Sequence, residues 1–175
     1  MCQKYGVLDH IMKRIIFLPV LFAVWIMNCG SMPKEMNERS MANSSDVTVT
    51  AITGREWKLI EVRINNRDTG FNRDVLVREG FDQFFTSNFD ADILSGTGAP
   101  NRYSAPYTLG DNQSVKIMIM RSTLMASFFQ PENLTEHDFF IYMQNAFEWR
   151  LVSDNLELRS KTADGSEVLL VFSPN

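Results

Sequence analysis

Beyond residue 50 the chain is a succession of short apolar runs separated by polar turn residues. Alternation of apolar and polar positions is typical of half-buried β-strands. The first run predicts a strand with Trp57, Leu59 and Glu61 on one face and Lys58, Ile60, Val62 and Ile64 on the other. Eight further strands are predicted at residues 75–77, 84–89, 93–97, 103–109, 115–120, 149–152, 156–159 and 168–172. Pro106 is expected to place its strand at a sheet edge or to form a bulge there.

One segment has helical rather than strand periodicity. Thr135, with Asp138 three residues later, resembles a capping box. Phe139, Tyr142 and Met143 then follow at helical spacing. The pattern predicts one helix near residues 135–147. Many short strands around one helix favour a mainly β (α+β) fold, in which an antiparallel sheet curls into a barrel or roll.

The N-terminal region has a different pattern. Lys13 and Arg14 precede an apolar run of thirteen residues, 15–27, which is shorter than the roughly 20 residues that a membrane-spanning helix needs. This order predicts an export signal over residues 1–29, with translation starting at Met1 or at Met12. Residues 30–50 are polar and predict a flexible tether, followed by a domain over 51–175.

The predicted signal ends at Cys29. The segment Ile26-Met27-Asn28-Cys29 resembles a bacterial lipobox of the relaxed, spirochaete-like kind, with Asn28 where Gly, Ala or Ser is usual. We expect lipid on Cys29 to anchor the protein in the bacterial cell envelope, at the outer membrane or its periplasmic face. The alternatives are an ordinary cleaved signal and an uncleaved anchor.

Charge and cysteine content exclude several classes of function. The net charge is −4, and residues 1–29 carry +2, so the part after Cys29 carries −6. A chain of this sign lacks the basic footprint of a nucleic-acid-binding protein. The only cysteines are Cys2 and Cys29, which leaves none in the domain for a disulfide or a thiolate metal site. No cofactor or metal is expected. The calcium-like spacing of Asn88, Asp90 and Asp92 does not continue into a complete calcium loop.

Two motifs resemble those of the META domain, an HslJ-like family. Residues 89–103 carry Phe-Asp, Ser-Gly and Asn101-Arg102-Tyr103, and residues 121–127 resemble the family's Ser-Thr-x-Met-Ala-Cys through Ser122, Thr123 and Met125. The resemblance covers roughly residues 55–173. Pro100 and Ser127 stand where many members have cysteine. The resemblance implies a barrel-like fold with one helix and an envelope role linked to heat or antibiotic stress. It brings no catalytic activity.

The candidate site residues each have a functional and a structural interpretation. Arg102 and Tyr103 either contact a ligand or, with Asn101, shape a turn. Ser122, Thr123 and Met125 likewise serve structure or ligand contact. A Ser or Thr nucleophile needs a base, and the domain's only histidine is His137, so a hydrolase using His137 is an alternative.

Paired aromatic residues indicate a binding surface. Phe128 and Phe129 precede Pro131 and are predicted to form a partner surface. The leading hypothesis is a non-enzymatic, lipid-anchored META-domain protein of the cell envelope that binds an envelope or protein partner. Its expected contacts are the membrane, through lipid on Cys29, and an envelope protein, with no nucleic acid. The alternative is a barrel-type carrier of a small apolar ligand.

Overall fold

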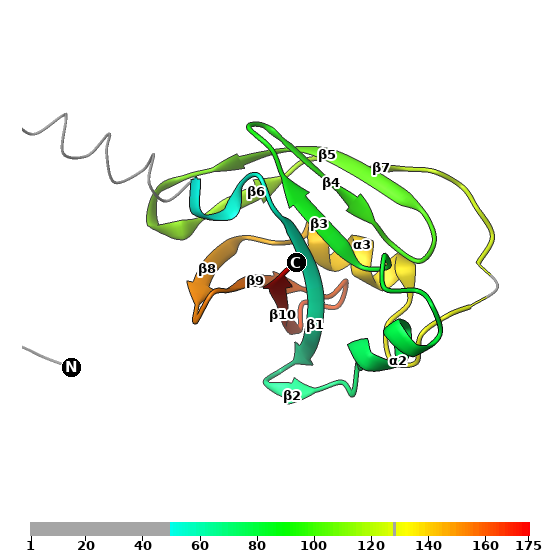
Figure 1. The fold of residues 1–175 in the computed structure, drawn as a ribbon. Helices are drawn as coiled ribbons and strands as arrows, with labels where there is room; N and C mark the ends of the chain where they lie inside the picture. The colour runs from blue at the N-terminus through cyan, green and yellow to red at the C-terminus, as the bar shows by residue number, and fades with distance from the viewer. Residues whose placement is uncertain (1–49, 128) are drawn as a thin grey trace, which may run out of the picture. The chain divides into compact units, whose positions relative to one another are not determined.

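A computed structural model describes residues 50–127 and 129–175 (Figure 1). The predicted export signal, Cys29, most of the predicted tether and Phe128 lie outside the described residues. The strands are β1 Glu56–Ile64, β2 Arg67–Asp68, β3 Thr86–Phe89, β4 Ile93–Thr97, β5 Arg102–Leu109, β6 Val115–Ile117, β7 Arg121–Ser122, β8 Glu148–Val152, β9 Asn155–Lys161 and β10 Glu167–Pro174. The helices are α2 Arg73–Arg78 and α3 Glu136–Gln144, with a short 3₁₀ turn at Asp111–Gln113.

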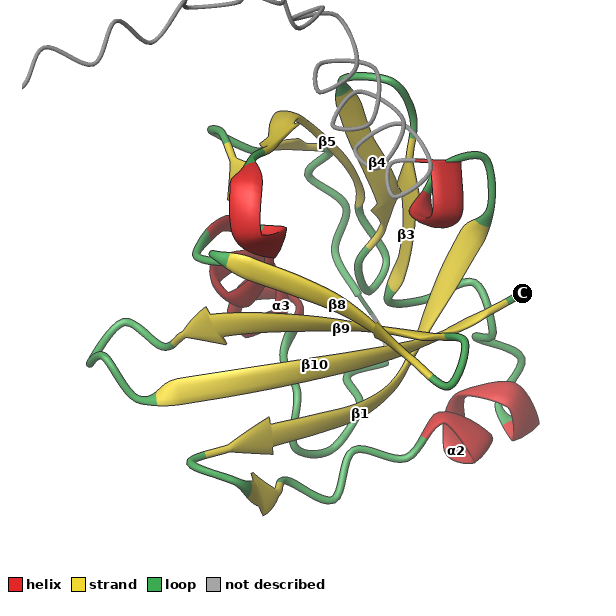
Figure 2. Cartoon of the chain, turned by 90° about the vertical axis from the view of Figure 1, so that its left-hand side faces the viewer, coloured by secondary structure: helices red, strands yellow, loops and turns green. Residues whose placement is uncertain are grey.

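The strands form a nearly closed antiparallel barrel. Neighbours follow the order β6-β5-β4-β3-β1-β10-β9-β8, while β2 pairs with β1 and β7 pairs with β5. Figure 2 shows β1, β10, β9 and β8 side by side, with β3, β4 and β5 continuing the sheet beyond β1. The two ends of this path meet where Ser114 bridges Glu148 and the Val115 amide donates to the Phe147 carbonyl (3.1 Å). The mainly β prediction is therefore confirmed.

Large side chains fill the interior of the barrel. The largest fully buried ones are Trp57, Phe85, Phe89, Phe139, Phe172, Ile52, Leu59, Leu76, Leu94, Met143, Leu156 and Leu158. Phe139 projects from α3 and its ring centroid lies 5.1 Å from that of Phe85 and 5.9 Å from that of Tyr103. A carrier of an apolar ligand would therefore have to use grooves on the surface rather than this filled interior.

The predicted helix cap is present in the structure. Thr135 is the N-cap of α3, and its hydroxyl accepts a hydrogen bond from the Asp138 amide (3.1 Å). Phe139, Tyr142 and Met143 are buried, as their spacing indicates. The helix ends at Gln144, a few residues before the predicted end.

The prediction of a strand at 75–77 was wrong, because these residues belong to α2. The Asn72 side chain caps α2 by accepting a hydrogen bond from the Asp74 amide (2.9 Å). Arg73, in the first turn, sends its buried guanidinium to the carbonyls of Leu59 (3.3 Å) and Phe84 (2.7 Å). The cap and this long-range anchor stabilise the helix against the β propensity of its two valines. Among the described residues, α2 is thus a helix that the sequence pattern did not predict.

The predicted faces of β1 were also wrong in part. The pairing of β1 with β10 passes from Leu59–Phe172 to Glu61–Val171, so Ile60 is an extra residue in β1. Such a bulge reverses the alternation that follows it. Val62 is consequently buried on the face of Trp57 and Leu59, whereas Glu61 lies outside with Arg63.

The start of β3, the end of β6 and the environment of Pro106 differ from the prediction. Phe85 precedes β3 in a left-handed conformation (φ 52°), and β6 ends at Ile117 rather than at residue 120. Pro106 lies neither on an edge strand nor at a bulge. It pairs in register with Ile93 of β4, and β5 has neighbours on both sides. On the other side of β5 lie β6 and β7. Pro106, which has no amide hydrogen to donate, lies at the gap between these two strands.

Candidate functional site

The buried residue Asn101 lies at the centre of a partly buried hydrogen-bond cluster that begins in the β4–β5 loop, after the cis peptide bond Ala99–Pro100. Its side-chain oxygen accepts from the Thr123 hydroxyl (2.9 Å) and the Met125 amide (2.6 Å). Its side-chain nitrogen donates to the Met125 carbonyl (3.1 Å) and to Glu136 Oε2 (2.6 Å). These four bonds use the whole hydrogen-bonding capacity of the amide. The Asn101 side chain is therefore fully occupied by the protein itself.

Glu136 joins this cluster from the first turn of α3. Its Oε1 accepts from the backbone amides of Ala99 (2.5 Å) and Asn101 (2.6 Å). Gly98 allows the helix to come this close, since a Cβ atom there would lie 2.6 Å from Glu136 Oε1 and 2.8 Å from Phe140 Cζ. We call the set Ala99, Asn101, Thr123, Met125 and Glu136 the Asn101 cluster. Sequence reasoning did not single out Glu136.

Arg102 and Tyr103 point in opposite directions from β5. Arg102 is exposed, and its backbone amide donates to the Thr123 hydroxyl (3.2 Å). The buried Tyr103 hydroxyl donates to the Thr86 carbonyl (2.9 Å) and lies 2.7 Å from Ser87 Oγ. Burial raises the pKa of Tyr103 well above its usual value, although the Ser87 hydrogen bond opposes the shift. The two neighbours in the motif therefore cannot contact one ligand together.

Ser122 and His137 lie on one surface groove of about 320 Å³, which is also lined by Met120, Phe140 and Gln144. Both are exposed. Among the described residues, His137 has no hydrogen bond or ion pair, so no carboxylate fixes the orientation of its imidazole. A hydroxyl and an imidazole thus share a groove, but no third group among the described residues orients the imidazole as a general base.

Phe129 belongs to a stack of three aromatic rings. The ring centroids of Phe81 and Phe84 are 4.8 Å apart, and those of Phe81 and Phe129 are 4.6 Å apart, both nearly parallel. Beside this aromatic stack (Phe81, Phe84 and Phe129) lies a groove of about 390 Å³ between α2 and residues 129–132. Val75 and Pro131 are among its lining residues. The stack holds the loop that contains the predicted partner surface.

A buried arginine forms the other polar centre that sequence reasoning missed. The Arg73 guanidinium also donates to the backbone and the carboxylate of Asp82. Lys58 Nζ lies 2.5 Å from the other Asp82 oxygen. Burial lowers the pKa of Arg73, and the hydrogen bond from Lys58, helped by Arg73, lowers the pKa of Asp82. The arrangement ties α2 and the 81–85 loop to β1.

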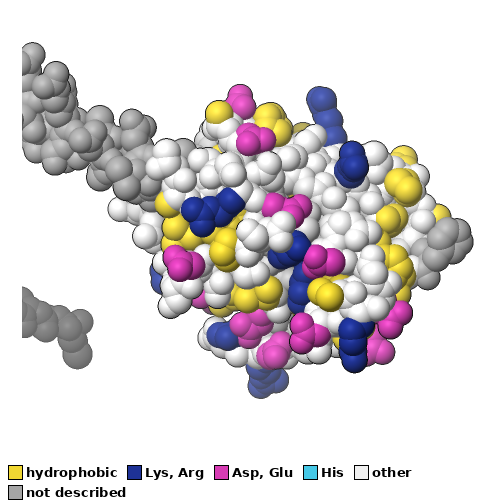
Figure 3. Space-filling model, viewed as in Figure 1, with side chains coloured by type: hydrophobic (Ala, Val, Ile, Leu, Met, Phe, Trp, Pro, Cys, Tyr) yellow, Lys and Arg dark blue, Asp and Glu magenta, His cyan; other side chains and the backbone are white. Residues whose placement is uncertain are grey.

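The described residues offer little for a metal or for nucleic acid. No group of three or more His, Cys, Asp or Glu side chains among them could hold a metal ion. On the face drawn in Figure 3, Lys and Arg side chains alternate with Asp and Glu rather than forming a continuous basic stripe. Within the same residues, no helix combines the length and the apolar character required to cross a bilayer.

Comparisons with known proteins agree with this fold. A model of the META domain family matches residues 50–174. A DUF4847 family protein from Bacteroides vulgatus ATCC 8482 is similar in structure, with 12% identity and a TM-score of 0.52 over 73% of this chain and 97% of that one. A protein from Burkholderia xenovorans, solved by NMR, has 14% identity and a TM-score of 0.51 over 74% and 87%. At these identities the likeness shows the fold alone. Comparison with curated proteins gives no match.

Proposed function

Since the chain belongs to the META domain family, we propose that it is a non-enzymatic, lipid-anchored protein of the bacterial cell envelope. It binds a protein partner through the surface formed by the aromatic stack and α2, and it serves the response to heat or antibiotic stress. The anchor in this proposal is Cys29. The stress link rests on the resemblance of the two sequence motifs to the HslJ-like family.

The aromatic stack is the observation that carries the proposal. Phe81 and Phe129 are only partly buried although they pack against the core, and the adjacent groove continues along α2. On the same helix, Val77 exposes 52% of its surface. Aromatic rings next to an exposed aliphatic side chain are the composition expected at the centre of a protein–protein interface.

The state of the polar motif residues supports a role without catalysis. The Thr123 hydroxyl donates to Asn101 and accepts from the Arg102 amide, so it is engaged in structure. Ser122 and His137 share a groove, but His137 lacks an orienting carboxylate among the described residues. A hydrolase would be supported by loss of a measured activity in a His137→Ala variant, and the proposal expects no such loss.

Cross-linking in intact cells tests the partner surface. Phe129→Ser and, separately, Val77→Ser should each remove the cross-links that the wild-type domain forms with its partner. Val152→Ser is the matched control, because Val152 is also exposed (44%) but lies on β8. Phe129→Ser removes a ring from the stack, so the fold of this variant is checked by circular dichroism. Val77 exposes 52% of its surface, so Val77→Ser disturbs the packing of the domain less. If the cross-links survive both substitutions, the aromatic stack and α2 do not form the partner surface.

The anchor is tested separately by mass spectrometry of the N-terminal peptide from the membrane fraction. We expect a peptide that begins at Cys29 and carries the added mass of acyl chains. Cys29→Ser should release the protein from the membrane. A peptide that begins elsewhere, or an unmodified Cys29, would contradict the lipid anchor while leaving the partner surface open to its own test.

A further inference from the structure

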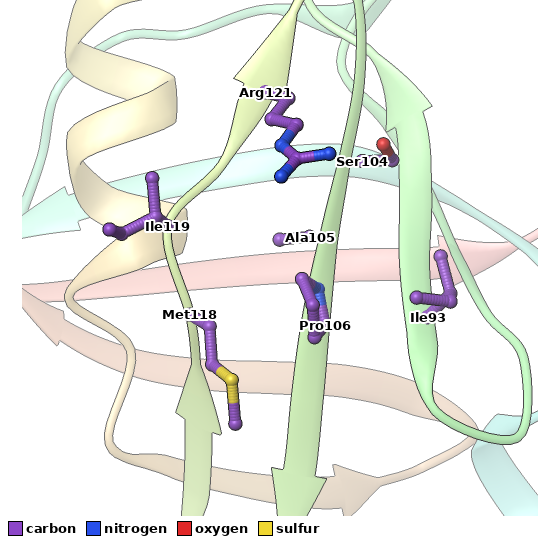
Figure 4. A pocket seen from close by; sticks show the side chains of 7 residues that line it. All are labelled: Ile93, Ser104, Ala105, Pro106, Met118, Ile119 and Arg121. Carbon is purple, nitrogen blue, oxygen red and sulfur yellow. The ribbon is translucent and has the colours of Figure 1, made fainter.

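A surface groove of about 390 Å³ opens on the outer wall of the barrel (Figure 4). It is lined by Ile93, Ser104, Pro106, Met118, Ile119 and Arg121. Figure 4 shows the Arg121 guanidinium near Ser104 at one end and Met118, Pro106 and Ile93 at the other. These residues come from β4, β5, the segment that joins β6 to β7 and the first residue of β7, and none of them belongs to the aromatic stack.

The groove originates at Pro106. On one side of β5, β6 pairs with residues 107–109 and β7 pairs with Tyr103 and Ser104. Pro106 lies between these two pairings, and its carbonyl still accepts from the Met118 amide (2.9 Å). Because proline has no amide hydrogen, the pairing is broken there. Residues 118–120 leave the sheet, and the side chains of Met118 and Ile119 form one wall of the groove.

The walls are apolar although they face solvent. Ile93 exposes 38% of its surface, Met118 42% and Ile119 77%. Three large apolar side chains around one hollow are unusual on the outside of a sheet and are typical of a binding site. Water in such a groove has few hydrogen-bonding partners, so an apolar chain can replace it favourably.

Arg121 is the only charged residue in the lining. It is exposed, and no carboxylate among the described residues pairs with it, although the part of the protein after Cys29 is acidic overall. The Ser104 side chain faces the same end and can donate a hydrogen bond. Asp92 precedes Ile93 at the opposite end. An anionic group is therefore attracted to the Arg121 end alone.

We infer that this groove binds a single alkyl chain that carries an anionic head group, as in a free fatty carboxylate. The head group pairs with Arg121 and Ser104, and the tail lies along Pro106, Met118 and Ile119. At about 30 Å³ for each water-sized group, 390 Å³ accommodates about a dozen non-hydrogen atoms. The volume favours chains of medium length. This inference is independent of the partner surface on α2.

The test is a methyl NMR titration of the full chain with sodium dodecanoate below its micelle concentration. The chain carries Cys29→Ser, so that no attached acyl chain competes. We expect dodecanoate to shift the methyl resonances of Ile93, Met118 and Ile119 first. Dodecyltrimethylammonium, which has the same tail and the opposite charge, should bind at least fivefold more weakly.

Two substitutions separate the head group from the tail. Arg121→Gln should weaken dodecanoate binding about fivefold, and Ile119→Ser should weaken it about tenfold. Arg78→Gln, at an exposed arginine on α2, is the matched control and should leave the affinity for dodecanoate unchanged. Equal binding of the two surfactants, or dodecanoate affinity that neither variant changes, would overturn the inference.

Vesicles distinguish a free ligand from a lipid surface. Phosphatidylglycerol vesicles present the same anionic and alkyl groups within a bilayer. The inference requires that dissolved dodecanoate binds by itself. If the protein sediments with these vesicles through Arg121 but dissolved dodecanoate does not bind, the groove is a membrane contact and the inference is wrong.

Discussion

Glu136 accepts two hydrogen bonds from Asn101, one from its backbone amide and one from its side chain, both 2.6 Å long. The two residues are 35 positions apart in the chain. Through this contact the first turn of α3 is tied to the loop between β4 and β5. A carboxylate at the N-terminal end of a helix also interacts favourably with the helix dipole. The motif residue Asn101 thus fixes the helix that fills the barrel with Phe139.

Glu136→Gln should destabilise the domain by about 2 kcal/mol. The amide keeps one accepting oxygen, but its nitrogen would face the Asn101 side-chain nitrogen, so two donors would meet in a partly buried site. Urea unfolding followed by tryptophan fluorescence measures the loss. Glu132→Gln is the control, since Glu132 is exposed in the preceding loop, and it should shift stability by less than about 0.5 kcal/mol. Equal unfolding midpoints for the two variants would contradict the role of Glu136.

Local sequence patterns predict the elements of this fold better than they predict its long-range contacts. The Thr135 cap and the buried stripe of α3 depend on residues within one helix, so the sequence suffices to predict them. The α2 helix depends on Arg73, whose guanidinium binds Leu59 and Phe84 carbonyls that are distant in sequence. A run of Val-Leu-Val carries no sign of that anchor and was interpreted as a strand.

In the candidate site, too, sequence patterns identify local motifs but not the long-range contacts. The motif resemblance identified Asn101, Thr123 and Met125 as members of two family motifs, and the structure joins them by hydrogen bonds. It did not identify Glu136, because a glutamate in a first helical turn is common and its partner is set by the tertiary fold. The bulge at Ile60 also had no local signal, since it is defined by pairing with β10.

Gly96→Ala should destabilise the domain by about 3 kcal/mol. A Cβ atom at this position would lie 2.0 Å from the Thr86 carbonyl oxygen and 2.8 Å from the Tyr103 hydroxyl. Backbone on the facing strand cannot move aside as a side chain can, so the pairing of β3 with β4 must distort. Thermal unfolding measures the change. Gly110→Ala is the matched control, because its Cβ would meet only the mobile Ser114 hydroxyl. A Gly96→Ala variant as stable as this control would refute the prediction.

Asp82→Asn should lower stability by about 1 kcal/mol at neutral pH, after allowance for the partial exposure of Asp82. Hydrogen bonds from Lys58 and Arg73 lower the Asp82 pKa below its usual 3.8 in the folded state. The stabilisation is therefore complete above pH 3.8 and is lost as the pH falls through the lower, folded-state pKa. Unfolding free energies of wild type and variant between pH 2 and 7 should converge at the acidic end. If the difference in unfolding free energy between wild type and Asp82→Asn stayed constant from pH 2 to 7, the link between Asp82 ionisation and stability would be contradicted.

Tyr103→Phe should cost about 1–2 kcal/mol at neutral pH, because it leaves the buried Thr86 carbonyl and Ser87 hydroxyl without their partner. It should also change the response to alkali. Burial raises the folded-state pKa of Tyr103 above the ordinary value of 10, so the unfolded chain loses its proton first as the pH rises. Wild-type stability should consequently fall above pH 10, and the variant, which cannot ionise there, should fall less steeply.

Tyr142→Phe provides the comparison for both effects. The hydroxyl of Tyr142 has no hydrogen bond among the described residues, so its removal should leave neutral stability nearly unchanged. Burial raises the pKa of Tyr142 as well, so this variant should also show a shallower alkaline decline. Urea unfolding at pH 7 and pH 10.5 measures both effects. Equal neutral stability of the two variants would contradict the Tyr103 hydrogen bonds. An unchanged alkaline slope in Tyr103→Phe would contradict the raised pKa, because the proton release that drives the decline must come from the tyrosines that folding buries.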